Sequence, residues 1–140
     1  MIQGHIVDLR DFIFVLLVKH NDEPYAEKEY KFIVKIWCSW FYMAPFMWLA
    51  IIQYKLGMNP LFVTNNNYVN LAIPLLLIIP YNLIFKQIFS WISIFPIDKN
   101  MNEFKYRHLR NKAIYIYVFG IALNSIIPWA IDRFMPSFIG

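Results

Sequence analysis

The sequence predicts an all-α fold, a polytopic helical membrane protein with three transmembrane helices and a short N-terminal interfacial helix. Three apolar stretches, approximately 36–54, 69–85 and 113–131, are almost free of charge. The chain is 59% hydrophobic and only 16% charged, which is unlike a typical soluble domain. Because a hydrocarbon core of about 30 Å needs about 20 helical residues, each stretch is long enough to approach or complete a crossing.

The three spans are expected at about 33–54, 69–92 and 113–134, within a single transmembrane domain covering residues 1–140. The first and third contain 19 consecutive residues without Asp, Glu, Lys or Arg, and no charge occurs between Leu56 and Phe85. A soluble helix bundle would need a polar face on each of these helices, and the stretches have none. The sequence therefore favours lipid as their surroundings.

The basic residues are distributed unevenly around the predicted spans. Five Lys and Arg precede the first span and six lie between Lys86 and Lys112, whereas only Lys55 follows the first span and Arg133 the third. Cytoplasmic loops are enriched in Lys and Arg. We therefore expect a multi-pass protein of a bacterial inner membrane, with the N-terminus and second loop in the cytoplasm and the C-terminus outside.

The N-terminal 31 residues are expected to form a cytoplasmic amphipathic helix followed by a linker. The apolar run 12–18 is too short to span, and with the preceding apolar residues it could lie at the membrane interface. A helix that docks on a partner or covers the underside of the bundle fits equally well. Residues 21–30 are charged and contain Pro24, which favours a solvated linker.

Asn82 and Asn124 are predicted to lie within a few residues of the bilayer centre. An amide in hydrocarbon is costly without partners, so each should face protein or water. Asn124 shares a helical face with the small residues Gly120 and Ala113, which permit close helix approach. The two amides are interpreted as interhelical contacts or, in an oligomer, as the lining of a polar pathway.

Each predicted span also contains a proline at depth, namely Pro45, Pro80 and Pro128. Proline removes one helical hydrogen bond and frees the carbonyl four residues earlier. In lipid, such carbonyls need partners from neighbouring helices, from water or from local distortion. The carbonyls concerned are those of Phe41, Leu76 and Asn124, and the last two join the asparagines as candidate lining of a pathway.

Lys105, Arg107, Arg110 and Lys112 form a basic stretch beside the third span. They are expected to contact lipid headgroups or a cytoplasmic partner. No nucleic-acid motif or set of stacking aromatic residues accompanies them, so we expect no nucleic-acid partner.

No enzyme motif is present, and we expect no catalytic residue, cofactor or metal. His5, His20 and His108 lack the spacing of zinc ligands, and Cys38 has no nearby His or Cys in the sequence. Residues 98–102 begin like a calcium loop, but the sixth position is Glu103 where glycine is required.

The layout resembles small three-span proteins of AT-rich bacteria, through the stretch 81–85 and the later Glu103-Phe104. This likeness implies no activity and no role for any residue. The sequence favours a homo-oligomer of effector or channel type that forms or gates a conducting pathway. The alternative is a non-catalytic accessory subunit of a membrane complex, which docks a cytoplasmic partner through its basic loop. Both hypotheses include self-association or contact with another membrane protein.

Overall fold

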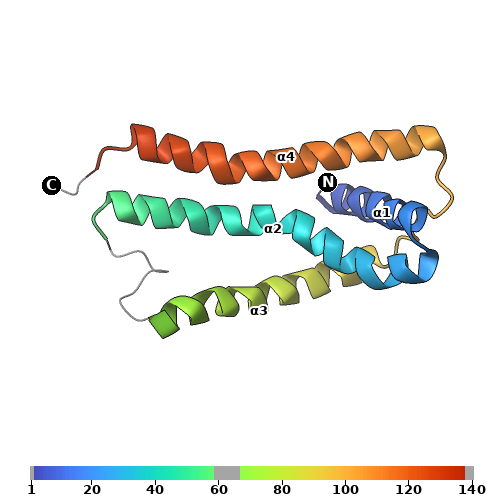
Figure 1. The fold of residues 1–140 in the computed structure, drawn as a ribbon, viewed down its shortest axis with the longest axis horizontal. Helices are drawn as coiled ribbons and strands as arrows, with labels where there is room; N and C mark the ends of the chain where they lie inside the picture. Colours follow the sequence, from blue (N-terminus) through green and yellow to red (C-terminus); the bar gives the residue numbers. More distant parts are fainter. Residues whose placement is uncertain (1, 59–66, 138–140) are drawn as a thin grey trace. The chain divides into compact units, whose positions relative to one another are not determined.

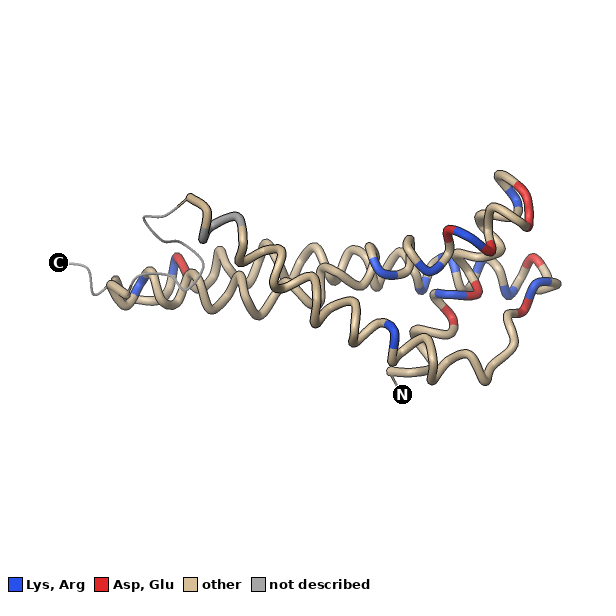
Figure 2. The backbone as a smooth tube through the Cα atoms, turned by 90° about the horizontal axis from the view of Figure 1, so that it is seen from below, with Lys and Arg blue, Asp and Glu red and all other residues tan. Residues whose placement is uncertain are grey.

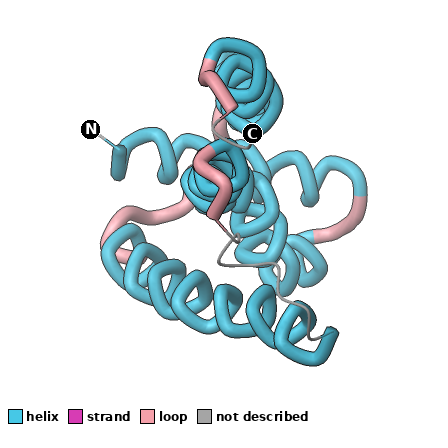
Figure 3. The backbone as a smooth tube through the Cα atoms, turned by 90° about the vertical axis from the view of Figure 1, so that its left-hand side faces the viewer, coloured by secondary structure: helices cyan, strands magenta, loops and turns pink. Residues whose placement is uncertain are grey.

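The computed structural model describes residues 2–58 and 67–137, which form four α-helices (Figure 1). Their bounds are α1 Ile2–His20, α2 Glu23–Lys55, α3 Asn67–Ile92 and α4 Glu103–Phe134. These described residues contain no strand (Figure 3), so the all-α prediction is confirmed. Residues 59–66, most of the segment between the first and second predicted spans, lie outside the described residues.

Three of the helices are long and apolar enough to cross a membrane. They are α2, residues 72–92 of α3, and α4, as the charge-free stretches predicted. α3 ends at Ile92, the end expected for the second span, and α2 and α4 end within a residue of their predicted limits. Insertion into a bilayer and the direction of threading remain predictions.

α2 and α4 begin about ten residues before the predicted spans, at Glu23 and Glu103. The segment 21–30, expected as a linker, is therefore mostly helical. The Asp22 carboxylate accepts a hydrogen bond from the Tyr25 N–H at 2.8 Å and so acts as the N-cap of α2. Pro24 is tolerated in the first turn because N–H groups there have no helical partner to lose. Asn102 likewise caps α4, accepting from the N–H of Lys105 at 2.8 Å. The predicted basic loop is thus largely the first three turns of α4.

The chain divides into two compact units, which we name by their charge content. The charged unit comprises residues 1–39 and 86–119, and the apolar unit comprises residues 40–85 and 120–140. Eleven of the thirteen Lys and Arg and eight of the nine Asp and Glu belong to the charged unit. Figure 2 shows how few coloured positions remain on the segments of the apolar unit.

α1 forms the core of the charged unit. Residues 9–15 of this helix are all buried, including both charged side chains in that stretch. Phe12 stacks on Tyr106 of α4 with ring centroids 5.5 Å apart, and Phe14 meets Tyr30 of α2 edge-on at 5.6 Å. Protein therefore covers the middle of α1 on every face. With 19 residues, α1 is also longer than the short helix expected.

Within the apolar unit, α3 uses one narrow stripe to contact α2. The half-buried or buried positions are spaced by four residues, at 73, 77, 81 and 85, and Tyr81 packs on Tyr42 with ring centroids 4.7 Å apart. The other described side chains of this part of α3 are exposed. Because those exposed residues are almost all apolar, this surface suits lipid or another hydrophobic helix.

Candidate functional site

Asn124 joins α4 to α2 within the apolar unit. Its Nδ2 atom donates to the backbone carbonyl of Trp40 at 2.7 Å and to the carbonyl of Gly120 at 2.9 Å. The side chain is half-buried. An amide that bridges two helices in this way stabilises helix packing in a membrane by about 0.6 to 2 kcal/mol.

Gly120 lies one turn before Asn124, where the α4 backbone approaches α2 closely. A Cβ atom on Gly120 would lie 2.9 Å from the Cβ of Trp40 and 3.3 Å from a ring carbon of Phe41. Real Cβ atoms do not tolerate the shorter distance, so a larger residue would push the helices apart. The absence of a side chain here is therefore what lets the Asn124 amide reach the Trp40 carbonyl.

Three hydrogen bonds between helices of the apolar unit end on carbonyls next to those that the prolines free. The Tyr42 hydroxyl donates to the carbonyl of Leu77 at 3.0 Å, next to the carbonyl that Pro80 frees. The Trp48 indole N–H donates to the carbonyl of Leu123 at 2.9 Å, adjacent to the carbonyl freed by Pro128. The acceptor of the Asn124 amide, the Trp40 carbonyl, likewise lies next to the Phe41 carbonyl, which Pro45 frees. Each of these three side-chain donors thus binds a carbonyl next to one that a proline frees.

Asn82 has a different environment from Asn124. It lies on α3 outside the stripe that contacts α2, and its side chain is exposed. Its Nδ2 atom donates to the carbonyl of Ile78, one turn earlier on the same helix, at 3.1 Å. The large side chains around it, Leu75, Ile78, Ile79 and Leu83, are also exposed. Asn82 therefore presents an amide on an apolar surface that the chain itself leaves uncovered.

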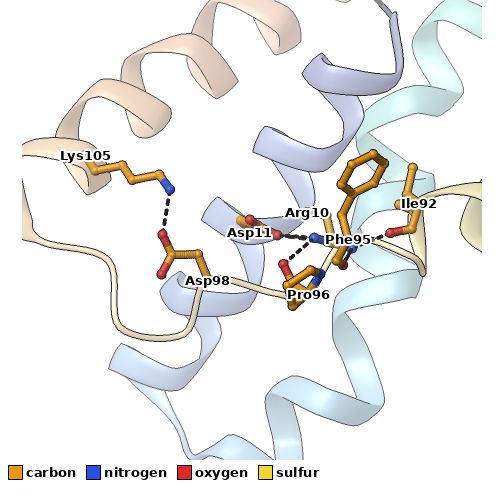
Figure 4. A network of polar contacts seen from close by, with 7 residues as sticks. All are labelled: Arg10, Asp11, Ile92, Phe95, Pro96, Asp98 and Lys105. Atoms are coloured by element: carbon orange, nitrogen blue, oxygen red, sulfur yellow. Dashed lines mark hydrogen bonds and ion pairs between the residues drawn. The ribbon is translucent and has the colours of Figure 1, made fainter.

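A buried ion pair lies inside the charged unit (Figure 4). Arg10 and Asp11 of α1 are only 2% and 6% exposed, and Arg10 Nε donates to Asp11 Oδ1 at 2.8 Å. Arg10 Nη1 donates to the carbonyls of Ile92 and Phe95, both at 2.9 Å, and Nη2 donates to that of Pro96 at 3.3 Å. Because the last carbonyls of a helix lack helical partners, the guanidinium caps the C-terminus of α3.

Asp11 extends the same network toward α4. The backbone N–H of Asp98 donates to its carboxylate, and the Asp98 side chain pairs with Lys105 Nζ at 2.6 Å. Burial raises the pKa of Asp11 above its usual value, and the Arg10 guanidinium acts against that shift. The network thereby holds α1, the segment 93–102 and the first turns of α4 together.

The sequence analysis did not identify Arg10 and Asp11 as functional or structural residues. The apolar run 12–18 covers nearly two turns without a polar residue, so every face of that part of α1 is apolar. A helix that is hydrophobic all round is typically buried, and this pattern could have predicted the core position.

The four predicted basic contact residues do not form one free cationic surface. The structure pairs Lys105 with Asp98 at 2.6 Å, Arg107 with Glu103 at 3.3 Å, and Lys112 with Asp8 of α1. Arg110 is exposed and forms no ion pair within the described residues. Carboxylates of the chain itself thus neutralise three of the four positions.

The described part of the chain contains no group of three His, Cys, Asp or Glu side chains placed to hold a metal ion. Within the apolar unit, Lys55 Nζ at the end of α2 pairs with Asp132 near the end of α4 at 2.9 Å.

Comparisons with models of protein families, with curated proteins and with solved structures each found no match. The class of the protein is therefore defined by its own fold. It is an all-helical protein whose three long helices are apolar enough for a multi-pass membrane protein.

Proposed function

We propose that the chain is a small integral membrane protein that self-associates through α3, and that the resulting homo-oligomer forms or gates a conducting pathway. The observation that carries the proposal is the exposed amide of Asn82 in the middle of the apolar surface of α3. We assign this amide, rather than that of Asn124, to the polar lining.

The surroundings of Asn82 in a bilayer favour self-association. As a single chain, the protein would present this exposed amide to hydrocarbon, where a polar side chain is costly. A second copy of α3 or a water-filled axis removes that cost. Leu75, Ile79 and Leu83 surround the amide with apolar surface that can pack against a neighbouring helix.

Asn124 is less suited to a lining because its amide is already committed to the α2–α4 contact. Its two hydrogen bonds, to Trp40 and Gly120, use both protons of Nδ2. We therefore expect Asn124→Leu to weaken folding, and Asn82→Leu to weaken association and flux while leaving the fold intact.

The test combines potassium efflux from reconstituted vesicles with the mass of the detergent-solubilised complex. The wild type should release potassium and run as an oligomer, and Asn82→Leu should lose both properties. Asn82→Gln should retain them in part. Ile126→Ala, which changes an exposed apolar residue on α4 outside the proposed α3 surface, is the matched control and should retain them fully. A monomeric wild type with tight vesicles would contradict the proposal.

The accessory-subunit hypothesis is supported by one separate observation, the exposure of Phe104. This ring is 83% exposed in the first turn of α4, eight residues before Lys112 and therefore beyond the charge-free part of that helix. An aromatic ring exposed to water, with Arg107 and Arg110 one and two turns further on, suits a cytoplasmic partner.

That alternative predicts a partner that co-purifies with the wild type and is lost from Phe104→Ser and from the charge reversal Arg107→Glu/Arg110→Glu. Phe134→Ser changes an equally exposed aromatic ring at the other end of α4 and should keep the partner. Equal recovery of the partner with all variants would rule out docking at this surface.

A further inference from the structure

The cations of the charged unit differ in whether the chain supplies them with a counter-charge. Lys31 and Lys86 are exposed, and neither forms an ion pair within the described residues. Glu27, one turn before Lys31 on α2, directs its carboxylate to Lys99 instead, at 3.5 Å. The cations that do pair with carboxylates are Arg10, Lys19, Lys28, Lys99, Lys105, Arg107 and Lys112.

Lys31 lies beside the ring of Phe89, and Lys86 lies about one turn before Phe89 on α3. The Lys31 ammonium is 6.0 Å from the centroid of the Phe89 ring, which itself packs edge-on against Tyr30 with centroids 6.2 Å apart. Lys86 precedes Phe89 by three residues, so the two share a face of α3 and their Cβ atoms lie about 5–6 Å apart. The flexible lysine side chains can therefore approach a common ligand above this ring.

Both lysines also lie close to the charge-free stretches of their helices. Lys86 follows the charge-free stretch 56–85, and Lys31 lies one turn before Lys35, the last charged residue of α2 before its own charge-free stretch. One helical turn is about 5.4 Å, which is within the depth of a headgroup layer. The exposed ring of Trp91 on α3 is typical of the same interfacial level.

We propose that Lys31 and Lys86 form a binding site for the phosphate of an anionic phospholipid. Lysine ammonium groups bind phosphate as point charges, and basic sites between membrane helices hold anionic headgroups in this way. The sequence analysis placed headgroup contacts at positions 105–112, but the structure neutralises Lys105 and Lys112 with Asp98 and Asp8. Apart from Arg110 on α4, the exposed cations of this unit that form no ion pair within the described residues are Lys31 on α2 and Lys86 on α3.

The experiment uses the purified full-length chain in detergent, titrated with dioleoylphosphatidylglycerol or dioleoylphosphatidylcholine, with bound lipids counted by native mass spectrometry. The wild type should hold one phosphatidylglycerol in preference to phosphatidylcholine. Each lysine contributes about fivefold in affinity, so Lys31→Gln/Lys86→Gln should weaken phosphatidylglycerol binding about 25-fold. Circular dichroism should show unchanged helicity, because both side chains are exposed.

The matched control is Lys28→Gln/Lys105→Gln, which removes the same charge from the same unit at two ion-paired positions. It should bind phosphatidylglycerol like the wild type. Equal weakening by both double variants would mean diffuse attraction and would overturn the proposed site, as would equal binding of the two lipids. Displacement of the bound lipid by excess inorganic phosphate would show a site for free phosphate and would also overturn it.

Discussion

Replacing Arg10 with methionine tests the buried ion pair most sharply. Methionine fills a similar volume but leaves the Asp11 carboxylate buried without its guanidinium and removes the donor to the Ile92 and Phe95 carbonyls. Because Arg10 and Asp11 are almost fully buried, breaking the pair should lower the free energy of unfolding by about 3–5 kcal/mol. That is a large part of the roughly 5–15 kcal/mol that stabilises a typical protein.

The assay is unfolding by sodium dodecyl sulfate in dodecylmaltoside micelles, followed by far-UV circular dichroism. Lys105→Met is the control, since it breaks the neighbouring ion pair with Asp98, which is partly exposed to solvent, and should cost less than about 1 kcal/mol. The double variant Arg10→Met/Asp11→Leu removes both charges and should recover most of the loss, because no buried charge is left unpaired.

Two results would refute this reasoning. One is an Arg10→Met variant no less stable than Lys105→Met, which would mean that the guanidinium does not cap α3 in solution. The other is a double variant less stable than Arg10→Met alone, which would mean that Asp11 stabilises the fold without its partner.

Three further predictions concern single side chains. Gly120→Ala should lower the free energy of unfolding by about 1–3 kcal/mol, because the added Cβ would clash with α2. The control Gly4→Ala adds a Cβ with no atom within 4 Å and should be neutral or stabilising. Unfolding in urea or detergent compares the two variants. Asp11→Asn should change how stability depends on pH. Because the pKa of Asp11 is raised in the fold, the folded wild type binds a proton more tightly than the unfolded chain, and its free energy of unfolding relative to the variant should rise as the pH falls through that pKa. A difference that does not change with pH would contradict the shift. Trp48→Phe should cost about 1 kcal/mol by removing the donor to the Leu123 carbonyl, and an unchanged unfolding midpoint would show that this bond contributes nothing.

The helical class and the ends of the long helices could be predicted from the sequence because charge marks them directly. Lys55 ends α2, and the charge-free stretch of α3 runs to Phe85, with Lys86 the one charged residue before the helix ends at Ile92. α2 and α4 begin about ten residues before the predicted spans, because these helices extend into charged sequence that the spans do not include. The caps at Asp22 and Asn102 decide where these helices begin, and they are local signals independent of lipid.

The partners of the asparagines could not be predicted, because they depend on how the helices pack. The sequence identified Asn124 and Gly120 as neighbours on one face, but only the packing of α4 on α2 selects the Trp40 carbonyl as the acceptor. The same limit applies to the basic residues. Lys112 and Asp8 are more than a hundred positions apart in the chain, so their pairing is a tertiary event.

The most direct test of the account is the side of the membrane on which each end of α4 lies. Single cysteines at Asn100 and Ser137, introduced into a Cys38→Ser background, would be labelled in intact cells with a membrane-impermeant maleimide. The account predicts that the cysteine at 137 reacts in intact cells and that the cysteine at 100 reacts only after permeabilisation. Labelling of both positions from the same side, or release of the protein from membranes by alkaline carbonate, would contradict it.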